Sequence, residues 1–98
     1  MTSAPTQRRL DSTGRRIRVG DIVRVIGVPD LDGMSRPGLR ETLPILRFLV
    51  GRYKRVVGFD ERGLAELAFR IATGRNRGLH TVWIEPHLLR VRRPRARP

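Results

Sequence analysis

Apolar and polar residues alternate in several short stretches of the chain, and an alternation with a period of two is the pattern of a half-buried β-strand. The stretches are residues 19–25, 52–59, 65–71, 79–84 and 89–92. Residues typical of turns separate them. The pattern predicts a small all-β domain of five strands with at most one short helix.

A hairpin between the second and third stretches is the clearest local signal. Positions 65, 67, 69 and 71 hold Ala, Leu, Phe and Ile, and Glu, Ala and Arg lie between them. In the preceding stretch Tyr53, Val57 and Phe59 alternate with polar or small neighbours. The four residues 60–63 (DERG) end in glycine, which suits a hairpin turn.

The connection between the first two strands is less regular. Residues 30–40 contain two glycines and a proline, and they predict a long irregular loop. Thr42 can cap a short helix running to about Val50, with Pro44 in its first turn and the apolar positions 43, 46, 49 and 50 on one face. An extended loop leading into the next strand is the alternative.

The two ends of the chain lack both the helical and the strand period. Residues 1–16 predict a disordered basic tail, and residues 93–98 (RPRARP) predict a second one, because proline excludes regular pairing there. Residues 85–88 predict a single tight turn before a last short strand, in which Leu89 and Val91 point inward. The expected folded domain is therefore residues 17–92.

The order of these elements is that of an SH3-like barrel, a small antiparallel β domain closed on itself. The run Val19–Val25 (VGDIVRV) resembles the G-D-x-V-x-V opening of SH3-like chains such as the ferredoxin–thioredoxin reductase variable chain and the nitrile hydratase β chain. The run Ile84–Val91 (IEPHLLRV) resembles their closing turn and strand. The resemblance implies a five-stranded SH3-like barrel that acts as a non-catalytic subunit or module packed against a larger protein.

Charge adds a second class of partner. Lys and Arg outnumber Asp and Glu by 21 to 9, a net charge of +12 that favours an anionic partner such as RNA or DNA. Residues 1–18 carry five Arg and one Asp, and residues 90–98 carry five Arg and no acid. Residues 19–89 carry eleven basic and eight acidic groups, so most of the excess lies at the ends of the chain.

Several other classes of function are not expected. The chain has no cysteine, and it contains no apolar run of about 20 residues that would span a membrane. The N-terminal residues lack the apolar run of a signal peptide, so we expect a cytoplasmic protein. We expect no cofactor and no small-molecule substrate.

The candidate nucleophiles are the serines, and the candidate metal ligands are His80, Glu85 and His87. The serines fall in expected tail or loop segments, so no nucleophile is paired with a base, and we expect no enzyme. His80, Glu85 and His87 are spaced within eight residues, but a strand places His80 and Glu85 on opposite faces, and His87 follows the turn at Pro86. We expect solvated polar groups there and no metal site.

The most suggestive cluster combines cations with aromatic rings, as single-stranded nucleic acid requires. Its members are Arg52, Tyr53, Lys54, Arg55, Arg75, Arg77 and Trp83. Two functions remain open. The first is an accessory module that docks on a larger protein through Trp83 and the loop 30–40, and the second is an RNA- or DNA-binding module in which these cations contact phosphates.

Overall fold

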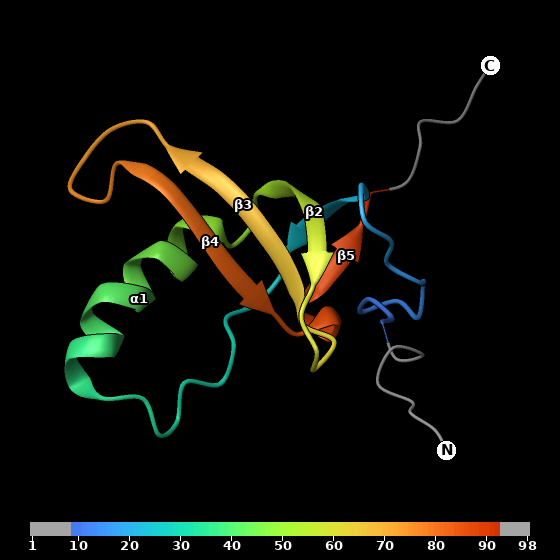
Figure 1. Ribbon diagram of the computed structural model, residues 1–98, viewed down its shortest axis with the longest axis horizontal. Coiled ribbons are helices and arrows are strands. Elements are labelled where there is room, and N and C mark those ends of the chain that lie inside the picture. The colour runs from blue at the N-terminus through green and yellow to red at the C-terminus, as the bar shows by residue number, and fades with distance from the viewer. Residues whose placement is uncertain (1–8, 93–98) are drawn as a thin grey trace.

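Five antiparallel strands in one sheet form the centre of the structure, a computed structural model that describes residues 9–92 (Figure 1). The elements in chain order are β1 (Ile22–Val25), α1 (Arg36–Leu49), β2 (Tyr53–Phe59), β3 (Ala65–Ile71), β4 (Gly78–Ile84), the 3-10 turn η2 (Pro86–Leu88) and β5 (Leu89–Val91). The prediction of a mostly β domain of five strands is confirmed. The disorder predicted for residues 1–8 and 93–98 lies outside the described residues.

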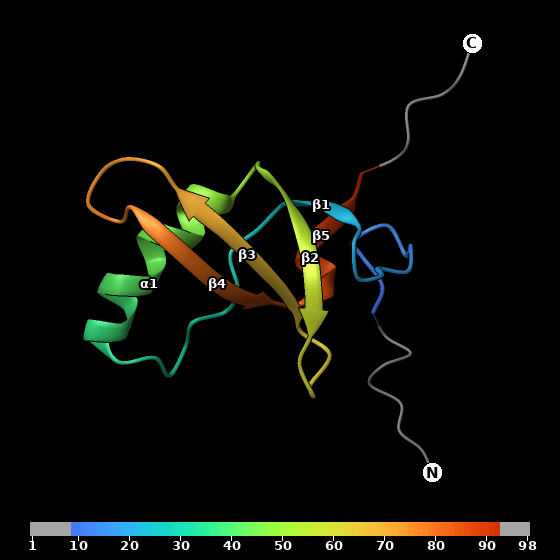
Figure 2. The same ribbon diagram turned by 45° about the horizontal axis from the view of Figure 1, so that its top comes forward.

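The strands lie in the order β4-β3-β2-β1-β5, and β2 connects two parts of the sheet. The first half of β2 pairs with β1 and its second half pairs with β3, with a register shift between Val56 and Gly58. A bulge of this kind increases local twist and bends the strand. β1 and β5 consequently lie at one end and the long β3–β4 hairpin at the other (Figure 2). Within residues 9–92 the sheet is open, with β4 and β5 as its edges.

The hairpin follows the sequence pattern closely. The side chains at positions 65, 67, 69 and 71 are all buried. In the turn, Asp60 Oδ1 accepts hydrogen bonds from the amides of Arg62 and Leu64 at 2.9 and 2.8 Å. Gly63 has a φ of +83°, the left-handed region that glycine reaches without strain. The predicted pairing and turn are therefore confirmed.

The sides of the sheet to which the β2 side chains point differ from those that the sequence pattern predicts. Val56 is fully buried, whereas Tyr53 is 50% exposed and Val57 is 44% exposed. Phe59 packs against the core because the bulge shifts the alternation by one residue after Val56. The apolar spacing in this strand therefore marks the outer face at its start and the inner face at its end.

The helix is longer than expected, and it begins in the segment predicted to be a loop. Ser35 is its N-cap, with Oγ accepting from the amide of Gly38 at 3.2 Å, and Pro37 lies in the first turn. Residues 36–40 are thus helical, Thr42 is not the cap, and Pro44 lies in the helix interior. Val50 is exposed, so the expected apolar face is wrong at its last position.

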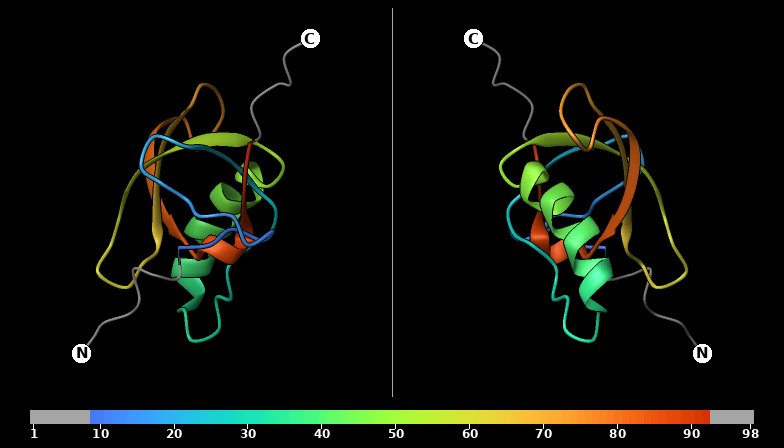
Figure 3. Two further views of the ribbon diagram at one scale, coloured as in Figure 1. Left: turned by 90° about the vertical axis from the view of Figure 1, so that its right-hand side faces the viewer. Right: turned by 90° about the vertical axis from the view of Figure 1, so that its left-hand side faces the viewer.

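Helix α1 packs its apolar side onto the inner face of the sheet. Leu46 and Leu49 are buried in the core, and the ring of Phe48 stacks on Phe69 of β3 with centroids 6.3 Å apart. In the end-on views of Figure 3 the strands curve around the side on which α1 lies. The helices of residues 9–92 include none that is long and apolar enough to cross a membrane.

Residues 9–16, which the sequence assigns to a tail, form a closed turn against β5. Leu10 and Arg16 form an isolated antiparallel β-bridge. The carboxylate of Asp11 is buried and accepts four hydrogen bonds. Oδ1 accepts from the amides of Thr13 and Arg15 and from the Thr13 hydroxyl, and Oδ2 accepts from the amide of Val91 at 2.8 Å. The amide of Ser12 donates to the carbonyl of Leu89 at 2.8 Å. This segment therefore covers the β5 edge of the sheet.

The cap assignment makes a stability prediction. Ser35→Ala removes the acceptor for the Gly38 amide and is expected to lower the free energy of unfolding by about 1 kcal/mol. Thr42→Ala leaves the cap intact and is expected to stay within about 0.5 kcal/mol of the wild type. Urea denaturation followed by far-UV circular dichroism measures both. A larger loss for Thr42→Ala would contradict the assignment.

Candidate functional site

The cluster expected from the sequence is distributed over several places. Tyr53 and Arg55 lie on the outer face of β2, but Lys54 points to the inner face, with Nζ 5.6 Å from the ring centroid of Phe69. Arg52 precedes β2 and turns back onto α1. Its guanidinium lies 4.0 Å from the ring centroid of Phe48, and Nε donates to the carbonyl of Phe48 at 2.6 Å.

The loop arginines lie beside the helix. Arg75 belongs to the β3–β4 loop, where it lines a hollow with Pro44 and Glu41 of α1. Arg77 is in the same loop, and its amide donates to the carbonyl of Gly74 at 3.3 Å. Both side chains are exposed, but they belong to the α1 end of the molecule, away from Tyr53.

Trp83 occupies the outer face of the edge strand β4. It is 47% exposed and pairs with Glu66 of β3. Two strands, β3 and β2, separate β4 from β1. The structure therefore does not join Trp83, Arg75 and Arg77 to Tyr53 in one surface.

A different set of side chains does form a continuous surface around Tyr53. Tyr53 of β2 pairs with Arg24 of β1, and Arg24 pairs in turn with Arg90 of β5. Directly opposed residues in antiparallel strands project from the same face of the sheet, so these three side chains form one row. We call the surface made by this row and its exposed neighbours the Tyr53 face. Its members are Arg24, Tyr53, Arg55, Arg90 and Arg92.

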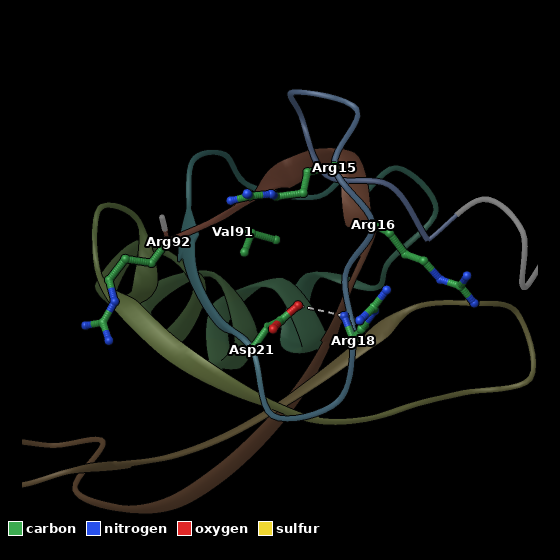
Figure 4. Close-up of a pocket in the computed structure, with 6 residues that line it drawn as sticks. All are labelled: Arg15, Arg16, Arg18, Asp21, Val91 and Arg92. Carbon is green, nitrogen blue, oxygen red and sulfur yellow. Dashed lines mark hydrogen bonds between the residues drawn. The ribbon is translucent and has the colours of Figure 1, made fainter. Parts of the chain in front are cut away.

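A second group of arginines continues this surface toward the N-terminal turn. Arg15, Arg16 and Arg18 line a hollow together with Val91 and Arg92 (Figure 4). Arg15 extends across Val91, whereas Arg16 and Arg92 point away from the hollow in opposite directions. The guanidinium groups are therefore spread along an open surface and do not converge on one point.

Acidic side chains do little to neutralise this surface. Asp21 also lines the hollow, where its Oδ2 accepts from the amide of Arg18 at 2.8 Å (Figure 4). Asp11 lies nearby, but its carboxylate is buried and fully occupied by hydrogen bonds. The ion pair found within residues 9–92 is Arg62 with Asp60, at 3.7 Å in the hairpin turn. The arginines of the Tyr53 face are thus available to an external anion.

The residues that sequence reasoning missed are Arg24, Arg90 and Arg92. The first two each lie between apolar residues, as Arg24 does between Val23 and Val25, so their outward direction was visible in the pattern. The strand order that places β5 beside β1 was not visible in the sequence. Only that order joins positions 24 and 90, which are far apart in the sequence.

The candidate metal ligands His80, Glu85 and His87 lie on β4, just before η2 and within η2. His80 contacts the carbonyl of Asn76 through Nε2 at 2.6 Å, and its ring stacks on Phe69 with centroids 5.6 Å apart. Glu85 precedes η2, and His87 lies exposed within it. Within residues 9–92 the structure brings no three His, Asp or Glu side chains into a group that would hold a metal ion.

Comparisons of this chain with models of protein families, with curated proteins and with solved structures found no match.

Proposed function

We propose that this protein is a non-catalytic binding module of the SH3-like class that binds nucleic acid through the Tyr53 face. Two features support the class. The strands β1 to β4 follow one another in the sheet, and a single 3-10 turn returns the chain so that β5 pairs with β1. The G-D-x-V-x-V resemblance falls on the turn before β1 and on β1 itself. Fold alone does not assign the partner, which is argued from the surface.

The row Tyr53–Arg24–Arg90 is the observation that carries the nucleic-acid function. Phosphate chains are bound by arginines that follow the backbone, and each contact releases counterions. The Tyr53 face and the neighbouring Arg15, Arg16 and Arg18 provide such a line of exposed guanidinium groups. Because these groups are spread out, they suit an extended polyanion better than a single small anion.

Tyr53 favours single-stranded nucleic acid as the form bound. Its ring is half exposed at the β2 end of the row, beside Arg24, where an unpaired base can stack on it while the arginines hold the adjacent phosphates. A duplex hides the faces of its bases, so it gains nothing from the ring. The cations alone would bind both forms.

The test is fluorescence anisotropy with a labelled single-stranded RNA of about 12 nucleotides at several salt concentrations. The control is the full chain with Arg8, Arg93, Arg95 and Arg97 changed to Gln, which removes charge outside the described residues. If the four arginines of the Tyr53 face contact phosphate, log Kd changes with log salt by a slope of about 3 in both proteins. Binding that disappears in the Gln variant would contradict the proposal.

The role of the ring gives a separate prediction. Tyr53→Ala is expected to weaken single-stranded binding by about 10-fold, because one base loses its stacking partner. Tyr53→Phe keeps the ring and is expected to bind like the wild type. Duplex binding measured in parallel is expected to be unchanged in both variants. An equal loss for the two nucleic acids would contradict a stacking role.

Docking to a larger protein, which the resemblance implies, is the second candidate function. The observation that favours it is the apolar outer face of β4, where Leu79 is 75% exposed and Trp83 is 47% exposed. Residues 30–40 were expected to complete that face as a loop, but residues 36–40 form the first part of α1. Co-purification from cells with wild-type and Trp83→Ala protein tests this function, with loss of a bound protein as the expected result.

A further inference from the structure

The two edges of the sheet are treated differently by the fold. The edge at β5 is short, at three residues, and it is covered by the N-terminal segment through Asp11 and Ser12. The edge at β4 is seven residues long, and no backbone hydrogen bond from elsewhere in residues 9–92 reaches its outer side. One edge is therefore closed and the other is available for pairing.

Strand β4 also lacks the features that protect exposed edges. Such edges usually carry Lys, Pro or a bulge, or they are very short. The sequence GLHTVWI contains no Asp, Glu, Lys, Arg or Pro, and its seven residues pair with β3 in an unbroken register. An edge that is regular, uncharged and apolar on its exposed face is a template for another strand.

We propose that β4 pairs antiparallel with β4 of a second copy of this chain, about a two-fold axis at Thr81. Thr81 is the middle residue of the strand, so this register places Leu79 of one copy opposite Trp83 of the other. On β3, Arg70 pairs with Leu79 and Glu66 pairs with Trp83. Each row across the junction then reads Arg70, Leu79, Trp83, Glu66, with a cation at one end and an anion at the other.

The distribution of charge supports a second copy as the occupant. The protein carries a net charge of +12, which opposes self-association if the charge lies at the contact. On the outer faces of β3 and β4 the charged residues are Glu66 and Arg70, which cancel, whereas the cationic Tyr53 face lies toward the β5 end. Pairing at β4 places the two cationic ends at opposite ends of a ten-stranded sheet, well beyond the screening length of about 8 Å at physiological salt.

This inference does not depend on nucleic-acid binding, and its test is the oligomeric state of the full chain without any ligand. Sedimentation equilibrium is expected to show a monomer–dimer equilibrium. Thr81→Lys places like charges opposite each other at the axis and is expected to weaken dimerisation at least about 10-fold. Ala68→Lys adds the same charge one strand further from the edge and is expected to weaken it less.

The register is tested by cross-linking, because the chain contains no cysteine of its own. Thr81→Cys brings two thiols to directly opposed positions, about 5 Å apart between Cα atoms, which is within the reach of a disulfide. Ala68→Cys leaves them about 14 Å apart across three strand spacings, which is beyond reach. Oxidation is expected to link the Thr81→Cys protein into dimers much faster than the Ala68→Cys protein.

Three results would overturn the proposal. The first is a chain that stays monomeric at all accessible concentrations, whatever other strand or protein its edge then binds. The second is equal cross-linking at positions 81 and 68. The third is a dimer that Thr81→Lys does not weaken while circular dichroism shows the variant to be folded.

Discussion

Replacing Asp11 with Ala is expected to lower the free energy of unfolding by about 3 kcal/mol. The carboxylate accepts four hydrogen bonds, and hydrogen bonds to a charged group are the stronger ones. Without it the amides of Thr13, Arg15 and Val91 lose their acceptor, and the N-terminal segment detaches from β5. Urea denaturation followed by far-UV circular dichroism measures the loss.

Asp30→Ala is the matched control. Asp30 is exposed, and its Oδ1 accepts one hydrogen bond, from the amide of Asp32 at 2.9 Å. Removing it is expected to cost about 0.5 kcal/mol. Similar losses for the two variants would show that the Asp11 network contributes little.

The contribution of Asp11 to the free energy of unfolding is also expected to depend on pH. Burial by itself raises the pKa of Asp11, but hydrogen bonds donated by Val91, Thr13 and Arg15 outweigh it and hold the pKa below its ordinary value of 3.8. As pH falls, the unfolded chain takes up the proton first, so the stabilisation is complete above about pH 4 and is lost as pH falls through the folded pKa. Asp11→Asn does not titrate, so its deficit relative to the wild type is expected to shrink below about pH 4.

The parts of the fold that the sequence predicted well are those determined by neighbouring residues. The β3 alternation, the DERG turn and the tight turn before β5 each depend on positions a few residues apart. The β2 facing was wrong because a bulge after Val56 changes the side to which the later residues point. A bulge leaves no mark on the local hydrophobic pattern when both faces of the strand carry apolar residues.

The helix and the N-terminal turn were misjudged for different reasons. Gly33, Pro37 and Gly38 predicted a loop, and Pro44 indicated the first turn of the helix, so the cap at Ser35 was missed. The Asp11 network closes on Val91, 80 residues away, so no local pattern contains it. Tertiary contacts decide both cases.

For the candidate site, the sequence predicted one cluster, whereas the structure places its members on different surfaces. Tyr53 and Arg55 stay together on the outer face because they are two apart in one strand. Lys54 turns inward for the same reason, and Trp83 falls on the far edge strand. Arg24 and Arg90, which continue the row from Tyr53, come from β1 and β5, whose pairing depends on the topology of the whole chain.

Reversing two charges of the Tyr53 face is expected to weaken single-stranded RNA binding by about 100-fold. Arg24→Glu with Arg90→Glu removes two phosphate contacts from the row beside Tyr53 and replaces them with repulsion. The slope of log Kd against log salt is expected to fall by about 1.4. Both side chains are exposed, so circular dichroism and the free energy of unfolding are expected to change little.

Arg40→Glu with Arg47→Glu is the control that separates this surface from general charge. Both residues are exposed on α1, and the double change alters the net charge by the same amount. A polycation that binds RNA only through its total charge would respond equally to the two double variants, because steering depends on the whole field. A defined interface responds to the first pair by about 100-fold and to the second by about 3-fold or less. Equal responses would mean that the row Tyr53–Arg24–Arg90 is not the contact surface.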